Sequence, residues 1–307
     1  FNTDSSITIK NLSVENSATR GIVVNIPETA TGDDFEVSLR RVTVAGSALY
    51  GLHLDDNASD FDDGETGSKI GIDLEIHNSS FTANGTGALD FDGIRVDERG
   101  EGDISSWIVN THIDANGGDG IKLDEAGKGS IYSTMNKVTI NNNGFYNVDD
   151  LDDGFDIDEA DEGSIFVNLF RVEANNNMDE GLDFDEGGEG GLNLHARRVK
   201  SNNNTDEGIK ADEEGEGDIV VDLVRVSVEN AGDDGIQITE LGEGKMSGFL
   251  NKVSVVNSAK FGIKAEQWFE EDEDLIVESA GSLKTKNIIL EGNAKGDNLE
   301  VHNVSIN

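Results

Sequence analysis

Hydrophobic and polar residues alternate over short stretches of this chain, and residues 208–234 illustrate the pattern. Within this segment, three short runs place an apolar residue at every second position. The apolar positions are Ile209 and Ala211, then Ile219, Val221 and Leu223, then Val226 and Val228. A period of two in runs rich in Val and Ile is typical of half-buried β-strands, whereas a helix repeats every three to four residues. The pattern therefore predicts three short strands in this segment.

The same unit recurs along the chain, and a glycine followed by two apolar residues with one residue between them marks each copy. These glycines are Gly21, Gly51, Gly93, Gly120, Gly154, Gly181, Gly208, Gly235 and Gly262. Successive members are 30, 42, 27, 34, 27, 27, 27 and 27 residues apart. A recurrent spacing indicates stacked repeats, each of which buries its apolar face only against its neighbours. We predict one domain over residues 1–307, with a break at 266–282 that forms a looped excursion or the edge of a cap.

Two positions of each unit predict turns. Between the second and third runs the alternation shifts by one residue, from Leu223 to Val226, which predicts a bend. Two residues beyond the third run, the chain repeatedly carries Asn or Gly, which adopt a left-handed backbone most readily. This predicted corner column consists of Asn16, Gly46, Gly85, Asn142, Asn176, Asn203, Asn230, Asn257 and Gly292. We expect a sharp corner at each member and hydrogen bonds between the stacked Asn side chains.

A third turn follows the glycine-led strand, where the chain reads Asp-Glu-x-Gly-Glu-Gly, as from Asp212 to Gly217. Three strands and three turns per repeat, together with the asparagine corner, resemble the right-handed parallel β-helix superfamily, which has the pectate-lyase-like fold. The resemblance covers Ile7 to Ile306. It implies an all-β chain that forms a single right-handed parallel β-helix of about eleven coils. It does not imply an activity, because this fold carries lyases, hydrolases, epimerases, tailspikes and adhesins. Open ends of such a rod favour aggregation, so we expect further coils of a longer chain or a partner there.

Composition narrows the classes of partner. The 63 Asp and Glu against 23 Lys and Arg give a net charge of −40, which argues against binding to nucleic acid or to an anionic membrane. The absence of Cys excludes disulfides, thiol catalysis and zinc–thiolate sites. There is no run of 18 apolar residues, so we expect no membrane insertion.

Acidic residues flank the glycine-led strand in repeat after repeat, and stacking turns them into rows. The candidate metal ligands are Asp119, Asp124, Asp152, Asp153, Asp158, Asp179, Glu180, Asp185, Asp206, Glu207, Asp212, Asp233 and Asp234. Like charges about 4.8 Å apart repel by roughly 1 kcal/mol in water and by more in a protein, so a counter-charge is expected. Calcium is the natural candidate, because it accepts six to eight oxygen ligands. The alternative is a solvated acidic surface that dissolved counterions screen.

An enzyme is the competing class. Polygalacturonase-type hydrolases of the resembling fold carry Asn-Thr-Asp and, about one coil later, Asp-Asp; here Asn204-Thr205-Asp206 precedes Asp233-Asp234. Lyases of the fold use an Arg or Lys base beside calcium, for which Lys210 is a candidate. The Gly-His-Gly and Arg-Ile-Lys segments of the hydrolases are missing, and the acidic pair belongs to the repeat itself.

Two further rows bear on partners. A basic row at the bend consists of Arg41, Lys137, Arg171, Arg198, Arg225 and Lys252, and we expect it to pair with carboxylates such as Glu173 and Glu229 rather than with an anionic partner. Trp107, Tyr132 and Phe166 fall at outward positions that suit sugar stacking.

The preferred hypothesis is an extracellular or cell-surface structural or adhesive rod, without catalytic activity, whose acidic face binds calcium. Its expected partners are polysaccharide or another surface protein; the alternative is a polysaccharide lyase or hydrolase.

Overall fold

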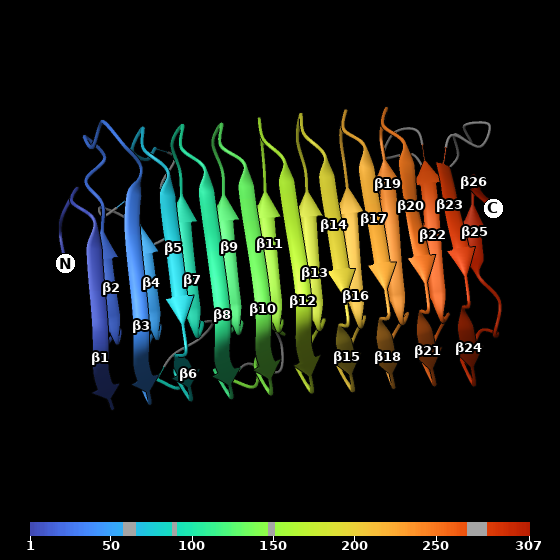
Figure 1. Cartoon of the computed structure of the whole chain (residues 1–307), viewed down its shortest axis with the longest axis horizontal. Helices are drawn as coiled ribbons and strands as arrows, with labels where there is room; N and C mark the ends of the chain where they lie inside the picture. Colours follow the sequence, from blue (N-terminus) through green and yellow to red (C-terminus); the bar gives the residue numbers. More distant parts are fainter. Residues whose placement is uncertain (58–65, 88–90, 147–150, 269–280) are drawn as a thin grey trace.

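The chain forms a rod of stacked coils. The computed structural model describes residues 1–57, 66–87, 91–146, 151–268 and 281–307. Within these ranges every helix-or-strand element is a strand, so no helix that could cross a membrane occurs there. Figure 1 shows successive coils side by side along the long axis, with the two termini at opposite ends. The strands pair in parallel in two sheets, which confirms the predicted all-β parallel β-helix.

The larger sheet contains the second and third runs of each repeat. Its main path is β1 (Ile7–Glu15), β3 (Phe35–Ala45), β5 (Ile72–His77), β8 (Ile104–Asp114), β10 (Ile131–Asn141), β12 (Ile165–Asn175), β14 (Leu192–Arg197), β17 (Ile219–Val224), β20 (Met246–Asn251), β23 (Gly281–Lys286) and β26 (Val304–Ile306). Short strands beside this path are β6 (Ser80–Thr82), β15 (Lys200–Asn202), β18 (Ser227–Glu229), β21 (Ser254–Val256) and β24 (Ile289–Glu291). The main path passes through eleven strands in the described ranges, in agreement with the predicted number of coils.

The smaller sheet contains the glycine-led strands. Their order is β2 (Ile22–Asn25), β4 (Leu52–Asp55), β7 (Ile94–Glu98), β9 (Ile121–Glu125), β11 (Phe155–Glu159), β13 (Leu182–Glu186), β16 (Ile209–Glu213), β19 (Ile236–Leu241), β22 (Ile263–Trp268) and β25 (Glu300–His302). Equivalent residues of successive repeats pair, as Asp124 does with Asp158 and Asp158 with Asp185. A residue type that recurs in the sequence therefore forms a continuous column along the rod.

The apolar residues of all three runs point between the two sheets and form one core. Ile121 and Leu123 of β9, for example, are fully buried, whereas Lys122 between them faces outward. The second and third runs form one bent strand in β1, β3, β8, β10 and β12, whereas they form separate strands in the coil of β5 and β6 and in the coils from β14 to β24. The residue at the bend has a φ between 49° and 61° in each coil from β1 to β24, which confirms the bend that the shifted alternation predicts.

The predicted corner column is correct in kind, with one misplaced member. Asn16, Gly46 and Asn142 have positive φ, as do the other predicted members. Gly85 does not belong to the column, because the backbone amide of Ala83 donates to Asp114 and takes that position, with a φ of 54°. Ala115 fills the next coil with a φ of 58°. Neighbouring strands hold these two alanines in a conformation that Asn or Gly would adopt at lower cost.

The residue after the corner forms a buried hydrogen-bonded column that the sequence analysis did not identify. Its members are Asn84, Asn116, Asn143, Asn177 and Asn204, and each donates from Nδ2 to Oδ1 of the next over 2.9–3.1 Å. The repeat glycines lie beside this column. A Cβ atom on Gly154 would come within 2.5 Å of both Asn177 Nδ2 and the carbonyl oxygen of Gly181. Glycine is therefore required by close packing between coils and not by a left-handed backbone.

Replacing a member of this buried column should be costly. Asn177→Ala leaves the buried amide and Nδ2 of Asn143 without their shared acceptor, so we expect a loss of about 2–4 kcal/mol of stability. The control is Asn230→Gly, which removes two exposed hydrogen bonds, one donated to Asn203 and one accepted from Asn257, and keeps the positive φ; its cost should stay below about 1 kcal/mol. Denaturant unfolding monitored by circular dichroism measures both, and equal losses would contradict the assignment.

The predicted break at 266–282 falls mainly outside the described residues. Residues 266–268 belong to β22 and residues 281–282 to β23, whereas 269–280 are not described.

Candidate metal centre

Carboxylates line the outer face of the smaller sheet at the entrance to each strand. The residue before the repeat glycine is acidic in six successive coils: Asp92, Asp119, Asp153, Glu180, Glu207 and Asp234. We call these six residues the pre-glycine column. Asp119 Oδ1 accepts a hydrogen bond from the amide of Asp153 over 2.5 Å, and Asp153 Oδ1 accepts one from the amide of Glu180 over 2.7 Å. One oxygen of such a carboxylate ties two coils together, which leaves the second oxygen for another partner.

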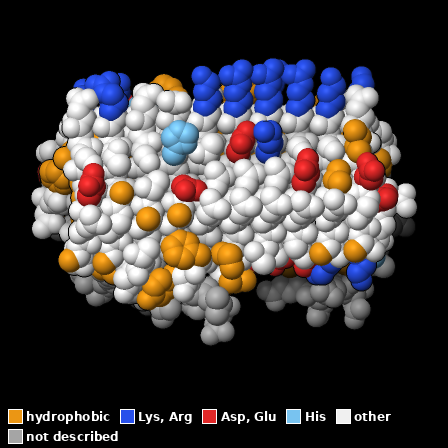
Figure 2. Space-filling model, turned by 90° about the horizontal axis from the view of Figure 1, so that it is seen from below, with side chains coloured by type: hydrophobic (Ala, Val, Ile, Leu, Met, Phe, Trp, Pro, Cys, Tyr) orange, Lys and Arg blue, Asp and Glu red, His pale blue; other side chains and the backbone are white. Residues whose placement is uncertain are grey.

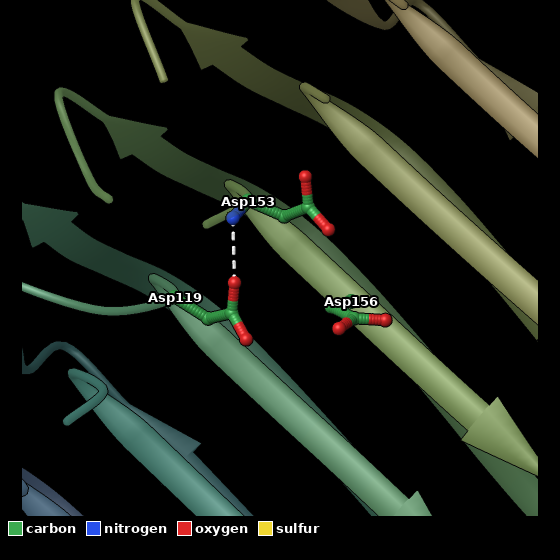
Figure 3. A group of neighbouring side chains, drawn as sticks. All are labelled: Asp119, Asp153 and Asp156. Carbon is green, nitrogen blue, oxygen red and sulfur yellow. Dashed lines mark hydrogen bonds between the residues drawn. The ribbon is translucent and has the colours of Figure 1, made fainter. Parts of the chain in front are cut away.

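Carboxylates of this column meet others in groups of three, one group in each of four successive gaps between coils. Within each group the candidate ligand oxygens lie within 4.8 Å of one another. The groups are Asp119, Asp153 and Asp156; Asp153, Asp179 and Glu180; Glu180, Asp206 and Glu207; and Glu207, Asp233 and Asp234. Figure 3 shows the first group, in which Asp156 points outward from β11 beside the hydrogen-bonded pair Asp119 and Asp153. We call the four groups together the acid file, and they could hold metal ions.

Burial makes ionisation of the acid file costly when no cation is bound. Asp153 and Asp156 are each 7% exposed. Burial, followed by repulsion from Asp92, raises the pKa of Asp119 to about 7. Burial and then Asp206 raise that of Glu207 to about 9. These carboxylates therefore bind protons near neutral pH unless a cation replaces them.

Buried carboxylate oxygens without hydrogen-bond partners also indicate that the acidic face needs a cation or a proton. Asp183 lies beside Asp156 in the next coil, and its side chain is 9% exposed. Its Oδ2 pairs with Lys210 over 2.9 Å, whereas its buried Oδ1 has no hydrogen-bond partner. Oδ1 of Asp233 is also buried without one. Unmet buried carboxylate oxygens are rare in proteins and favour an ion or a proton at the site.

Eight of the thirteen predicted ligands lie in the acid file: Asp119, Asp153, Asp179, Glu180, Asp206, Glu207, Asp233 and Asp234. The other predicted ligands are not part of these groups: Asp124, Asp152, Asp158, Asp185 and Asp212. Four of them are the last-but-one residues of their strands and lie near basic side chains. Asp124 pairs with Arg95 and Arg99, Asp158 with Lys122, and Asp185 with Lys210, while Asp212 lies 3.9 Å from Lys210.

Sequence reasoning missed Asp156, which stands at the middle outward position of its strand. The equivalent residue is Lys122 in the coil before and Asp183 in the coil after. The alternation that places Lys122 outside also places Asp156 there, and this signal would have added Asp156 to the candidate ligands.

A second acidic column lies inside the coil. Glu98, Glu125, Glu159, Glu186, Glu213 and Glu240 end their strands with the side chain facing inward, and each is at most 2% exposed. Glu125 Oε1 accepts a hydrogen bond from the amide of Gly129 over 3.1 Å, and Glu213 accepts one from Gly217. Gln267 continues the column after Glu240. We call these six glutamates the inner Glu column.

Neighbours in the inner Glu column raise the pKa of one another. Burial, followed by the neighbouring carboxyl groups of Glu186 and Glu125, raises the pKa of Glu159 to about 9, and burial followed by Glu186 raises that of Glu213 to about 9. Burial raises the pKa values of the alternate members Glu125 and Glu186 as well. Protonated glutamic acids therefore alternate with charged glutamates along the inner Glu column.

The candidate catalytic residues also lie on the acidic face. Asp206 and Asp233 are one coil apart, because the amide of Asp233 donates to the carbonyl of Asp206. Lys210 contacts Asp183 and Asp185, and although burial opposes its charge, these carboxylates raise its pKa above the ordinary value. A lysine held protonated in this way is unsuited to act as a base. The enzyme alternative based on Asp206, Asp233, Asp234 and Lys210 stays a prediction.

Comparison of the chain with models of protein families, with curated protein sequences and with solved structures gives no match.

Proposed function

We propose that this chain is a structural or adhesive rod, located outside the cell or on its surface, whose acidic face binds calcium along the acid file. The observation that carries the proposal is the repetition, in four successive gaps between coils, of three-carboxylate groups in which at least two members are buried. Bound cations would join neighbouring coils and stiffen the rod. Assignment of the coil to the pectate-lyase-like superfamily belongs to the same proposal and rests on the repeat length and the asparagine corners.

Calcium fits these groups better than magnesium does. Each group offers three carboxylates at or near the start of a strand, and calcium tolerates irregular oxygen shells completed by carbonyls and water. Magnesium requires near-ideal octahedral geometry and loses its water reluctantly. Transition metals would favour His or Cys ligands, and each group contains carboxylates alone.

The number of ions follows from which ligands are shared. Neighbouring groups share Asp153, Glu180 or Glu207, and divalent ions one coil apart would repel by about 14 kcal/mol at an effective dielectric of 20. Alternate groups share no ligand. We therefore expect about two calcium ions per chain in alternate gaps.

Isothermal titration calorimetry of chelator-treated protein tests the proposal. Calcium should bind with release of protons, because it displaces them from carboxylates whose pKa is raised. Glu207→Gln, which alters two groups, should lower the number of bound ions by about one. Glu216→Gln, on an exposed turn, is the control and should leave the titration unchanged. Binding that magnesium matches, or that Glu207→Gln does not affect, would contradict specific sites.

A further inference from the structure

A continuous row of cations runs along the bend of the larger sheet, on a chain that is otherwise strongly acidic. Figure 2 shows Lys and Arg side chains in a row along one edge of the rod. Five successive coils contribute Lys137, Arg171, Arg198, Arg225 and Lys252, all of them exposed. We call these five residues the basic ridge. At about 4.8 Å per coil, the basic ridge is roughly 19 Å long.

The basic ridge is not neutralised within the chain. Among the described residues, no ion pair joins any of its five members to a carboxylate, although the chain has 63 acidic residues. The expected pairing with Glu173 does not occur, because Glu173 pairs with Lys200 over 2.9 Å. Desolvation, followed by repulsion from Arg171 and Arg225, lowers the pKa of Arg198. The row thus presents mutually repelling charges to solvent.

The backbone at the basic ridge makes these side chains unexpected. Its five members have φ between 58° and 61°, in the left-handed region where Asn and Gly are favoured. The same position carries Asn78, Asn110 and Asn287 in other coils. Long cations therefore occupy five successive sites where a neutral Asn would fit the backbone better. Neither backbone preference nor internal ion pairing explains them.

Aromatic side chains line two shallow grooves on the larger sheet, one of which reaches the basic ridge. This groove of about 420 Å³ is bordered by Trp107, Phe170 and Arg197, of which the last two immediately precede ridge residues. Trp107 also borders a second groove of about 480 Å³, farther from the ridge, together with Tyr132 and three carboxylate side chains, those of Glu36, Asp73 and Glu75. The ring of Tyr132 stacks on that of Phe166 at 4.9 Å, and Trp107 and Tyr132 are 49% and 42% exposed. Flat rings and cations thus face solvent on one surface.

We propose that the basic ridge and the adjoining aromatic grooves form a binding site for an anionic polysaccharide that lies along the rod axis. Its acidic groups would meet the evenly spaced cations, and the faces of its sugar rings would lie on Trp107 and Tyr132. The ridge carries a local positive field although the whole chain is negative, because charges beyond about 8 Å are screened at physiological salt. This inference does not depend on calcium binding at the acid file.

By charge alone, the basic ridge could also bind a second copy of the chain. A copy would offer Glu162, Glu189, Glu216 and Glu243, exposed residues that recur at the same coil spacing as the ridge. Two chains with a net charge of −40 each repel, however, and a row of glutamates gives no role to the exposed rings. The aromatic grooves therefore favour a sugar chain.

The test is direct binding of heparin oligosaccharides of graded length to the whole chain in the presence of chelator, which keeps the acid file free of metal. Affinity should rise with oligosaccharide length until the ligand spans the basic ridge and then level off. It should fall as salt is raised, as expected for several ionic contacts. Arg171→Asn, Arg198→Asn and Arg225→Asn together should weaken binding about 30-fold or more, while Asn suits the left-handed backbone.

Matched controls separate the two parts of the site. Lys69→Asn, Lys128→Asn and Lys245→Asn together remove the same charge away from the ridge and should change affinity less than about threefold. Trp107→Ala with Tyr132→Ala should weaken heparin binding about tenfold and leave binding of inorganic polyphosphate, which has no rings, unchanged. Circular dichroism verifies that each variant is folded.

Three results would overturn the proposal. The first is ridge variants that bind heparin as the wild type does. The second is equal effects of the aromatic variant on heparin and polyphosphate, which would reduce the ridge to a general polyanion surface. The third is ridge-dependent self-association in sedimentation experiments without heparin binding, which would make a second copy the occupant. None of these results bears on calcium binding, and a failed calcium titration leaves this test intact.

Discussion

Calcium added to chelator-treated protein is expected to raise its melting temperature by about 10 °C. Two sites, each at about 100 times its dissociation constant, would add about 5 kcal/mol, and a domain of this size gains roughly 2 °C per kcal/mol. The gain arises because only the folded chain brings Asp119, Asp153 and Asp156 together, so calcium binds the folded state and not the unfolded one. Differential scanning calorimetry at fixed ionic strength measures it.

The Asp153→Asn variant distinguishes bound ions from general screening. Asp153 belongs to two groups of the acid file, and the Asn oxygen can still accept the hydrogen bond from the amide of Glu180. We expect it to lose about half of the calcium-dependent gain, because one of the two expected ions loses its site. Asp218→Asn is the matched control, because Asp218 also accepts a hydrogen bond from the next coil, from Lys245, but lies outside the acid file. A gain that sodium or magnesium reproduces in full would refute specific calcium sites.

The fold is readable from the sequence because each repeat contributes similar residues at similar places. Alternation within a run reports which face is buried, and the glycine spacing reports the coil length. Gly154 shows why the second signal is strong: any side chain there would collide with the neighbouring coil. The corner column was harder to place, since Ala83 and Ala115 adopt the left-handed backbone through their neighbours and carry no local signal.

The candidate site was only partly readable for a different reason. Composition marks the acidic rows, but it does not separate Asp212, which faces outward, from Glu213, which faces inward. The strict alternation of Ile209, Ala211 and Glu213 does place Glu213 on the buried face. Charged side chains usually avoid a core, however, and this expectation argues against an inward Glu213. Which carboxylate pairs with which cation depends on how neighbouring coils are aligned. The contacts of Asp124 with Arg95 and Arg99 therefore required coordinates.

Without calcium, the chain is expected to become less stable as pH rises from about 5 to about 9, the reverse of ordinary acid denaturation. The inner Glu column contributes most clearly. The pKa values of Glu159 and Glu213 are raised to about 9 in the folded chain, so the folded state binds more protons than the unfolded state. Their stabilising contribution is complete below the unfolded pKa near 4.3 and is lost as pH rises through the folded value. Each unit of pKa corresponds to about 1.4 kcal/mol, so the melting temperature should fall by about 10 °C or more.

Substitution with glutamine tests whether shared protons are the cause. Gln267 already occupies the inner column, where its amide donates to the carbonyl of Gly244 over 2.9 Å and its Oε1 accepts from Met246. Glu159→Gln with Glu213→Gln should therefore imitate the protonated acids between their carboxylate neighbours. In the presence of chelator, this variant should melt higher than the wild type at pH 9 and show a flatter pH profile. Glu189→Gln with Glu216→Gln makes the same charge change on exposed turns and should keep the wild-type slope.

The effect of calcium on the pH profile of stability separates the contribution of the inner Glu column from that of the acid file. Calcium should flatten the part of the profile that comes from the acid file, because the cation takes the place of the protons at Asp119 and Glu207. Calcium should not change the part of the pH dependence that comes from Glu159 and Glu213, because these side chains face the interior. A wild-type profile that rises from pH 5 to pH 9 would mean that the inner glutamates are charged in the folded rod. The alternation of acids and carboxylates would then be wrong.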